Sequence, residues 1–94
     1  ITTVGDIQEI VARHFSLNAA DLRAKGNARR IAEPRQIAMY LARDLTESSL
    51  PQIGKAFGGK HHTTVLHSVR KVAKMAEQDP GTRALLKRLS DSIN

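Results

Sequence analysis

The chain has 94 residues, of which 40% are hydrophobic and only 3% aromatic, and its formal net charge is +6. This length is typical of one domain, and the scarcity of aromatic residues requires a core of aliphatic side chains. The absence of cysteine excludes disulfides, thiolate metal sites and a cysteine nucleophile, and no apolar run approaches the roughly 18 residues of a membrane span. Because the chain starts with Ile1 rather than Met, we expect it to be part of a longer protein.

Helical periodicity runs through the chain, and no segment alternates like a strand. A first helix should begin at Thr3, with Asp6 completing a capping box. Asn18 caps a short second helix from Ala19 to about Lys25, which Gly26 closes. Residues 26–30 then form a polar loop. The apolar stripe of the first helix comprises Ile7, Ile10, Val11 and Phe15.

Four further helices are expected after this loop. Pro34 opens the third helix from within its first turn. Ser49 and Gln52 form an S-x-x-Q capping box for a brief fourth helix, which stops at Gly58-Gly59. The fifth helix runs from about His62 to Gln78, and the sixth follows Asp79-Pro80. The predicted buried positions are Ile37, Ala38, Leu41 and Leu45 on the third helix, Val65, Val69, Val72 and Ala76 on the fifth, and Leu85, Leu86, Leu89 and Ile93 on the sixth. The prediction is an all-α single domain, residues 1–94, of about six helices.

The positive charge lies in the middle of the chain. Residues 23–74 hold eleven Lys and Arg against three acidic residues, whereas residues 1–22 carry a net −2 and residues 75–94 are neutral. Such a block is typical of a surface that binds a polyanion, although a solvated basic surface is the alternative.

A helix-turn-helix pattern spans residues 49–78, with a short helix, a glycine turn and a longer helix. The second helix would present its N-terminal end to base edges in a major groove. The candidate base contacts there are Lys60, His61, His62 and Thr63, with Thr64 beside them. Histidine can donate or accept, and threonine adds a methyl that packs on thymine. The alternative is an ordinary helical hairpin with a polar first turn.

No metal site is predicted, because His61, His62 and His67 lack i,i+4 spacing and no carboxylate or cysteine joins them. We expect His67 on a packed flank of its helix. No paired carboxylates or nucleophile–base pair indicate an enzyme.

Two more basic groups precede the pair of helices. The loop group, comprising Arg23, Lys25, Arg29 and Arg30, could enter a minor groove or be merely solvated. On the third helix, Arg35, Met39 and Arg43 share a face at i,i+4 spacing, with Gln36 beside it. We expect this face to point away from the core and to follow a phosphate backbone.

Three stretches resemble the C-terminal domain of the bacterial replication initiator family DnaA: PRQIAMYLARDLT (34–46), SLPQIGKAFGGKHHTTVLHSVRKV (49–72) and, more loosely, DIQEIVARHFSLNAADL (6–22). The resemblance implies a helical domain with a Trp-repressor-like core that binds double-stranded DNA. It implies recognition of DnaA boxes at the replication origin, one domain per box, close to TTATNCACA. It also implies a cytoplasmic, nucleoid-associated protein.

The resemblance assigns base contacts to His62 and Thr63. It assigns backbone contacts to Arg35, Gln36, Arg43, Leu50, Pro51, Thr64 and Lys71. Two positions depart from the family: His61 stands where an acidic residue usually caps the helix and contacts a base, and Asn27 stands at the minor-groove arginine. Because histidine is expected to cap poorly, we predict a looser helix start, and we expect Arg29 or Lys25 to replace the missing arginine.

No cofactor is expected in this chain, since it lacks the G-x-x-x-x-G-K-[ST] phosphate loop, and ATP would bind the absent upstream module. The resemblance implies other initiator copies as partners of the full-length protein, and leaves open a contact with acidic phospholipid near the upstream linker. Two alternative functions remain: a dimeric transcription regulator on a palindrome, and a helical interaction domain with an acidic partner.

Overall fold

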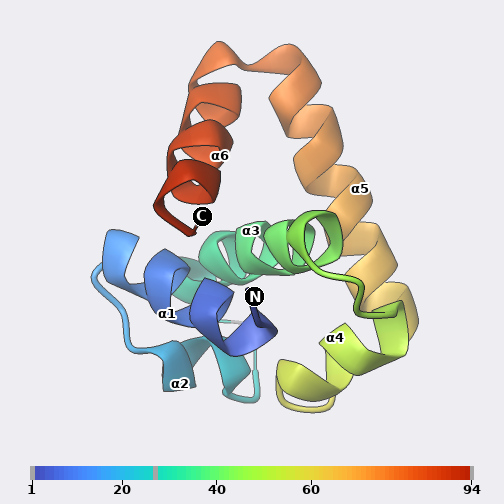
Figure 1. Ribbon diagram of the computed structural model, residues 1–94. Coiled ribbons are helices and arrows are strands. Elements are labelled where there is room, and N and C mark those ends of the chain that lie inside the picture. The colour runs from blue at the N-terminus through green and yellow to red at the C-terminus, as the bar shows by residue number, and fades with distance from the viewer. Residues whose placement is uncertain (1, 27, 94) are drawn as a thin grey trace.

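The computed structural model describes residues 2–26 and 28–93, and these residues form six helices (Figure 1). No strand occurs within these two ranges, so the predicted all-α fold is confirmed. The helices are α1 (Val4–His14), α2 (Ala19–Arg23), α3 (Arg29–Leu45), α4 (Leu50–Ala56), α5 (His62–Gln78) and α6 (Pro80–Ile93).

Helix α3 lies at the centre of the molecule, with α1, α2, α4, α5 and α6 packed around it (Figure 1). Its inward face carries Ile37, Ala38 and Leu41, all at most 1% exposed, as predicted. Phe57 is the largest fully buried side chain, at the end of α4. The rest of the fully buried core is aliphatic or methionine, namely Ile7, Val11, Leu22, Met39, Ile53, Val65 and Val72. Burial of this apolar surface is the main favourable term that holds the helices together.

The predicted capping boxes are present at α1 and α4. The Thr3 hydroxyl accepts from the Asp6 amide and the Asp6 carboxylate accepts from the Thr3 amide, both at 3.1 Å. At α4 the Ser49 amide donates to the Gln52 side chain at 2.7 Å, and the Gln52 amide donates to the Ser49 hydroxyl at 3.2 Å. These bonds satisfy amides that lack partners within the helix, which fixes where each helix begins.

The boundaries around the basic loop differ from the prediction. Helix α2 ends at Arg23 rather than near Lys25, and α3 begins at Arg29, five residues before Pro34. The Ala28 carbonyl accepts from the Ile31 and Ala32 amides, which starts α3 without any side-chain cap. Pro34 is buried inside the helix, where it forgoes one backbone hydrogen bond. Arg29 and Arg30 therefore belong to the first turn of α3.

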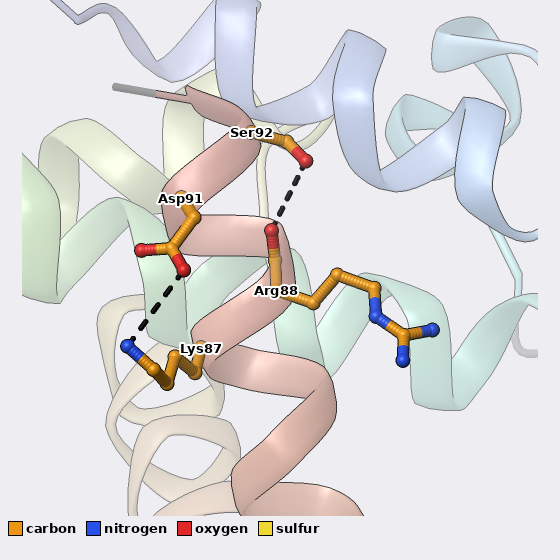
Figure 2. A network of polar contacts seen from close by, with 4 residues as sticks. All are labelled: Lys87, Arg88, Asp91 and Ser92. Atoms are coloured by element: carbon orange, nitrogen blue, oxygen red, sulfur yellow. Dashed lines mark hydrogen bonds and ion pairs between the residues drawn. The ribbon is translucent and has the colours of Figure 1, made fainter.

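Helix α6 starts at a tight polar junction and carries an exposed ion pair further on. The Asp79 carboxylate accepts from the Thr82 hydroxyl at 2.8 Å and the Gly81 amide at 3.2 Å. Lys87 Nζ lies 3.8 Å from the Asp91 carboxylate, and the Ser92 hydroxyl donates to the Arg88 carbonyl. Dashed lines mark both contacts in Figure 2. The ion pair is 70–80% exposed, so it contributes little to stability.

Candidate nucleic-acid interface

Helices α4 and α5 are joined by a turn that closes on one carbonyl. The Gly54 carbonyl accepts from the Gly59 amide at 3.1 Å and from the Lys60 amide at 2.8 Å. Gly58 and Gly59 have φ of +84° and +82°, a backbone conformation that other residues rarely adopt. The turn therefore depends on this glycine pair, and it lets α5 start packed against α4.

His61 is the N-cap of α5. Its ring Nδ1 lies 3.2 Å from the Thr63 amide, from which it accepts, and 2.7 Å from the Thr63 hydroxyl. The His62 ring is stacked at a tilt on the His61 ring, with 4.4 Å between their centroids. Histidine thus does cap this helix, through a ring nitrogen that accepts from an amide of the first turn. Its expected weakness as a cap stays a prediction.

The start of α5 forms a polar, solvent-facing end. His61, His62, Thr63 and Thr64 are exposed, and Lys60 is half-exposed just before them. A small hollow between α3 and α5 is lined by Lys60 and by residues of both helices, namely Ala32, Arg35, Gln36, Met39, Thr64 and Ser68. The structure thus brings together four predicted contact residues, namely Arg35 and Gln36 of α3 with Lys60 and Thr64 at the start of α5.

The other predicted backbone contacts surround this end. Leu50, half-buried, and Pro51, exposed, lie in the first turn of α4. Arg43 is exposed near the end of α3, but its guanidinium donates to the Ser48 carbonyl at 3.0 Å, so it also holds the α3–α4 connection. Lys71 is exposed on α5. His67 is exposed as well, so the prediction that it packs on a flank is wrong.

His67, Arg70, Lys71 and Lys74 line one shallow depression on α5. The spacing 67, 70, 71 and 74 puts these side chains on one face of the helix. Of these four residues, only Lys71 was predicted to contact DNA. The helical repeat was the signal that could have identified the others.

The loop group lies on the surface before and at the start of α3. Lys25 is exposed in the loop, and Arg29 and Arg30 are exposed on the first turn of α3. Asn27 lies outside the described residues. Helix α2 and the turn after α4 lie along the same edge of the molecule (Figure 1), and the Arg23 carbonyl touches Gly58 in that turn.

Arg35 does not occupy the exposed position that its spacing predicted. It is only 6% exposed, and its guanidinium donates to the carbonyls of Leu22 (3.2 Å), Gly26 (3.0 Å) and Ala24 (3.1 Å). Met39, one turn on, is 1% exposed. The predicted exposed face of Arg35, Met39 and Arg43 is therefore wrong, because packing of α2 and α5 on α3 covers its first two members.

Burial lowers the pKa of the Arg35 guanidinium from its usual value. The cause is desolvation of the charged form. Arginine nevertheless stays protonated in proteins, so Arg35 places a positive charge beneath the loop.

A buried glutamine, Gln8, was missed in the sequence. It is 2% exposed on α1, donates to the Ala56 carbonyl at 2.9 Å and accepts from Arg23 Nη1 at 2.9 Å. The available signal was its position beside Ile7 and three residues before Val11, which puts a polar side chain at the edge of the apolar stripe.

Within the described ranges, no three His, Asp or Glu side chains are grouped so as to hold a metal ion. None of the helices there is both long and apolar enough to cross a membrane.

Comparison with known proteins gives concordant results. Residues 4–72 match the family model of the bacterial DnaA protein helix-turn-helix. The chain is 50% identical over 78 residues to the chromosomal replication initiator protein DnaA of Symbiobacterium thermophilum and 54% identical over 77 residues to that of Geobacter sulfurreducens. These matches cover 83% and 82% of the chain, but the chain spans only 17% of either relative.

A crystal structure of a DNA replication initiation factor superposes with a TM-score of 0.80 at 33% sequence identity. The match covers 97% of this chain and 29% of the other. The six-helix arrangement is therefore shared with a solved protein over nearly its whole extent.

Proposed function

The chain belongs to the bacterial DnaA helix-turn-helix family, and on that premise we propose that it binds double-stranded DNA sequence-specifically in the initiation of chromosome replication. The preferred sites would be DnaA boxes of the replication origin, bound by one domain each. The upstream ATP-dependent module and other initiator copies would be partners in the longer protein.

The exposed N-terminal end of α5 carries this proposal. His62 and Thr63 are exposed, so their hydrogen-bond donors and acceptors and the threonine methyl group face solvent and not the core. The amides of a helix N-terminus also attract phosphate. Lys60 and Gln36 lie beside this end, so base-edge groups and phosphate-binding groups converge on one surface.

The residues around the start of α5 would contact the phosphate backbone on both sides of the major groove. Lys71 and Arg43 supply cations, Thr64 a hydroxyl, and Leu50 and Pro51 the first turn of α4. We assign base contact to Lys60, His61, His62 and Thr63. Lys25, Arg29 and Arg30 would approach the neighbouring minor groove. The His61 ring already caps α5 through Nδ1, which leaves Nε2 as its free nitrogen for a base.

Selection from random duplexes, followed by a single-mismatch series at fixed salt, tests the proposal. A sequence-specific domain should enrich one asymmetric motif, and each mismatch in it should cost about 1–3 kcal/mol. Sedimentation of the complex should give one chain per motif, whereas a dimeric regulator would select a palindrome. An interaction domain with a basic face would show no base preference, and that result would refute the proposal.

A further inference from the structure

Three carbonyls at alternate positions, one in the last turn of α2 and two in the basic loop after it, point to one side chain. The carbonyls of Leu22, Ala24 and Gly26 all accept from the Arg35 guanidinium, at 3.0–3.2 Å. The side chains between them are directed elsewhere, and Lys25 in particular is exposed. Arg35 therefore binds the inner edge of the loop, while the cationic side chain remains on the outer edge.

Arg23, the last residue of α2, is also connected to the helix-turn-helix by hydrogen bonds. Arg23 donates to Gln8, and Gln8 donates to the Ala56 carbonyl at the end of α4. The Arg23 carbonyl lies so close to Gly58 that a β-carbon there would collide with it. The chain between α2 and α3 is thus held from α3 by Arg35 and from the α4–α5 turn by Arg23.

In the described part of the loop, residues 24–26, the Ala24 amide also donates to the Asp21 carbonyl at 3.3 Å. Ala24, Lys25 and Gly26 are all exposed, so they bury little apolar surface, and Gly26 has φ of +93° with open space around its Cα. Hydrogen bonds from a charged donor to buried acceptors are the stronger kind. In an exposed segment such bonds should contribute strongly to the local order.

On the premise of the proposed function, we infer that Arg35 is a positioning residue, which with Gln8 and Arg23 fixes the basic loop at a set distance from the start of α5. Two DNA contacts held rigidly relative to one another bind without first ordering the loop, which is the advantage of preorganisation. Lys25 and Thr63 then act on one duplex at a defined spacing. Arg35 contributes through the loop and not by its own contact with phosphate.

A double-mutant cycle distinguishes positioning of the loop by Arg35 from direct contact of Arg35 with phosphate. Arg35→Met keeps an unbranched stem but removes every donor, Lys25→Ala removes the loop cation, and Lys71→Ala removes a cation on α5 as the matched control. Duplex affinity is measured for all single and paired variants on the selected site at one salt concentration. Melting curves confirm that each variant is folded.

If Arg35 positions the loop, Lys25→Ala should weaken binding about fivefold in the parent chain. In a chain that already carries Arg35→Met, the same change should weaken binding less than about twofold. Lys71→Ala should cost the same factor in both backgrounds, because distant independent sites are additive. Arg35→Lys retains the charge but not the planar fork, so it should lose the coupling to Lys25 as Arg35→Met does. It also replaces Arg35→Met in the cycle should the latter fail to fold.

Additive losses of Lys25→Ala and Arg35→Met would overturn the inference, since they indicate that Arg35 acts on DNA directly. Recovery of parental affinity and coupling by Arg35→Lys would overturn it too, because charge alone would then suffice. A failure of the proposed function is distinct: the parent chain itself would then show no base preference in the mismatch series.

Discussion

The carbonyl oxygen of Lys60 lies directly against the α-carbon of Gly54, at a distance that leaves no room for a β-carbon. The Lys60 amide meanwhile donates to the Gly54 carbonyl at 2.8 Å. The start of α5 is therefore packed on the backbone of α4, and Gly54 sets how closely the two helices approach.

Gly54→Ala should open this turn, because the added methyl meets a backbone carbonyl that cannot rotate away. We expect a loss of about 1–3 kcal/mol in the free energy of unfolding, as for overpacking in a core, and weaker binding to specific duplex. Urea unfolding measures the first. Gly5→Ala is the control, because its methyl would meet only the Thr3 hydroxyl at 3.6 Å, and it should be neutral or stabilising. A Gly54→Ala protein as stable as the parent would contradict the packing argument.

Binding should depend steeply on salt, because the positive block of residues 23–74 faces phosphates in the proposed complex. If about six phosphates are contacted, a plot of log K against log salt should have a slope near −5. Titrations of the selected duplex between low and moderate salt give this slope. A slope shallower than about −2 would be incompatible with a polyanion-binding surface.

Thr63→Ala and Lys71→Ala should affect specific and random DNA differently. Loss of a base contact at Thr63 should cost about 1–3 kcal/mol on the selected site and far less on random duplex. Loss of the Lys71 charge should weaken both nearly equally and reduce the salt slope by about one unit. Equal losses on both duplexes with Thr63→Ala would show that Thr63 contacts no base.

His61 gives a prediction about both stability and discrimination. Because its Nδ1 accepts from the Thr63 amide, His61→Ala should lower the free energy of unfolding by about 0.5–2 kcal/mol, the usual loss for a removed N-cap. His61→Asp keeps an acceptor, so it should stay near parental stability.

The aspartate would also place a negative charge beside phosphate. His61→Asp should therefore weaken binding to random duplex and sharpen preference at one base pair, where it can accept only from an amino group. Melting curves and the mismatch series test the two parts separately. An unchanged base preference together with unchanged random-duplex affinity would mean that His61 does not face DNA.

Asp79 makes the α5–α6 junction sensitive to acid. The hydrogen bond from the Thr82 hydroxyl, followed by that from the Gly81 amide, lowers the pKa of the Asp79 carboxyl from its usual value of 3.8. A depressed folded-state pKa means that the carboxylate stabilises the fold above the usual value, and that this stabilisation is lost as pH falls through the lowered pKa.

Asp79→Ala should accordingly have a lower melting temperature than the parent at neutral pH. The difference in melting temperature should shrink as pH falls below about 4. Thermal melts from pH 7 to pH 2.5 follow it. Asp91→Ala, which breaks only the exposed pair with Lys87, should change the melting temperature little at neutral pH. A constant difference between Asp79→Ala and the parent at every pH would rule out the carboxylate as the cause.

The helices themselves were predictable because each carries local signals: capping boxes at Thr3 and Ser49, and the apolar repeat that buries Ile37 and Val65. The start of α3 was not, because Pro34 normally marks a first turn, whereas this helix begins five residues earlier on backbone bonds to the Ala28 carbonyl, with no side-chain cap as a signal. The exposed end of α5 followed from the glycine turn.

The roles of Arg35 and Gln8 could not be predicted in the same way. Both depend on carbonyls that the fold brings near them: those of Leu22, Ala24 and Gly26 for Arg35, and that of Ala56 for Gln8. Periodicity assigns a residue to a helix face but does not show which backbone from another segment will cover that face. Arg35 was therefore expected in solvent.

Arg35 is held by carbonyl dipoles and not by a carboxylate; in the ranges 2–26 and 28–93 the side-chain ion pair is Lys87–Asp91, on a different helix. Dipoles satisfy its donors without cancelling its charge. A fixed cation thus remains under the surface, where mobile salt ions screen it less than they screen Lys25. Its field reaches an approaching polyanion before any contact forms, so this charge should act mainly on the rate of encounter, leaving the lifetime of the complex to the residues at the surface.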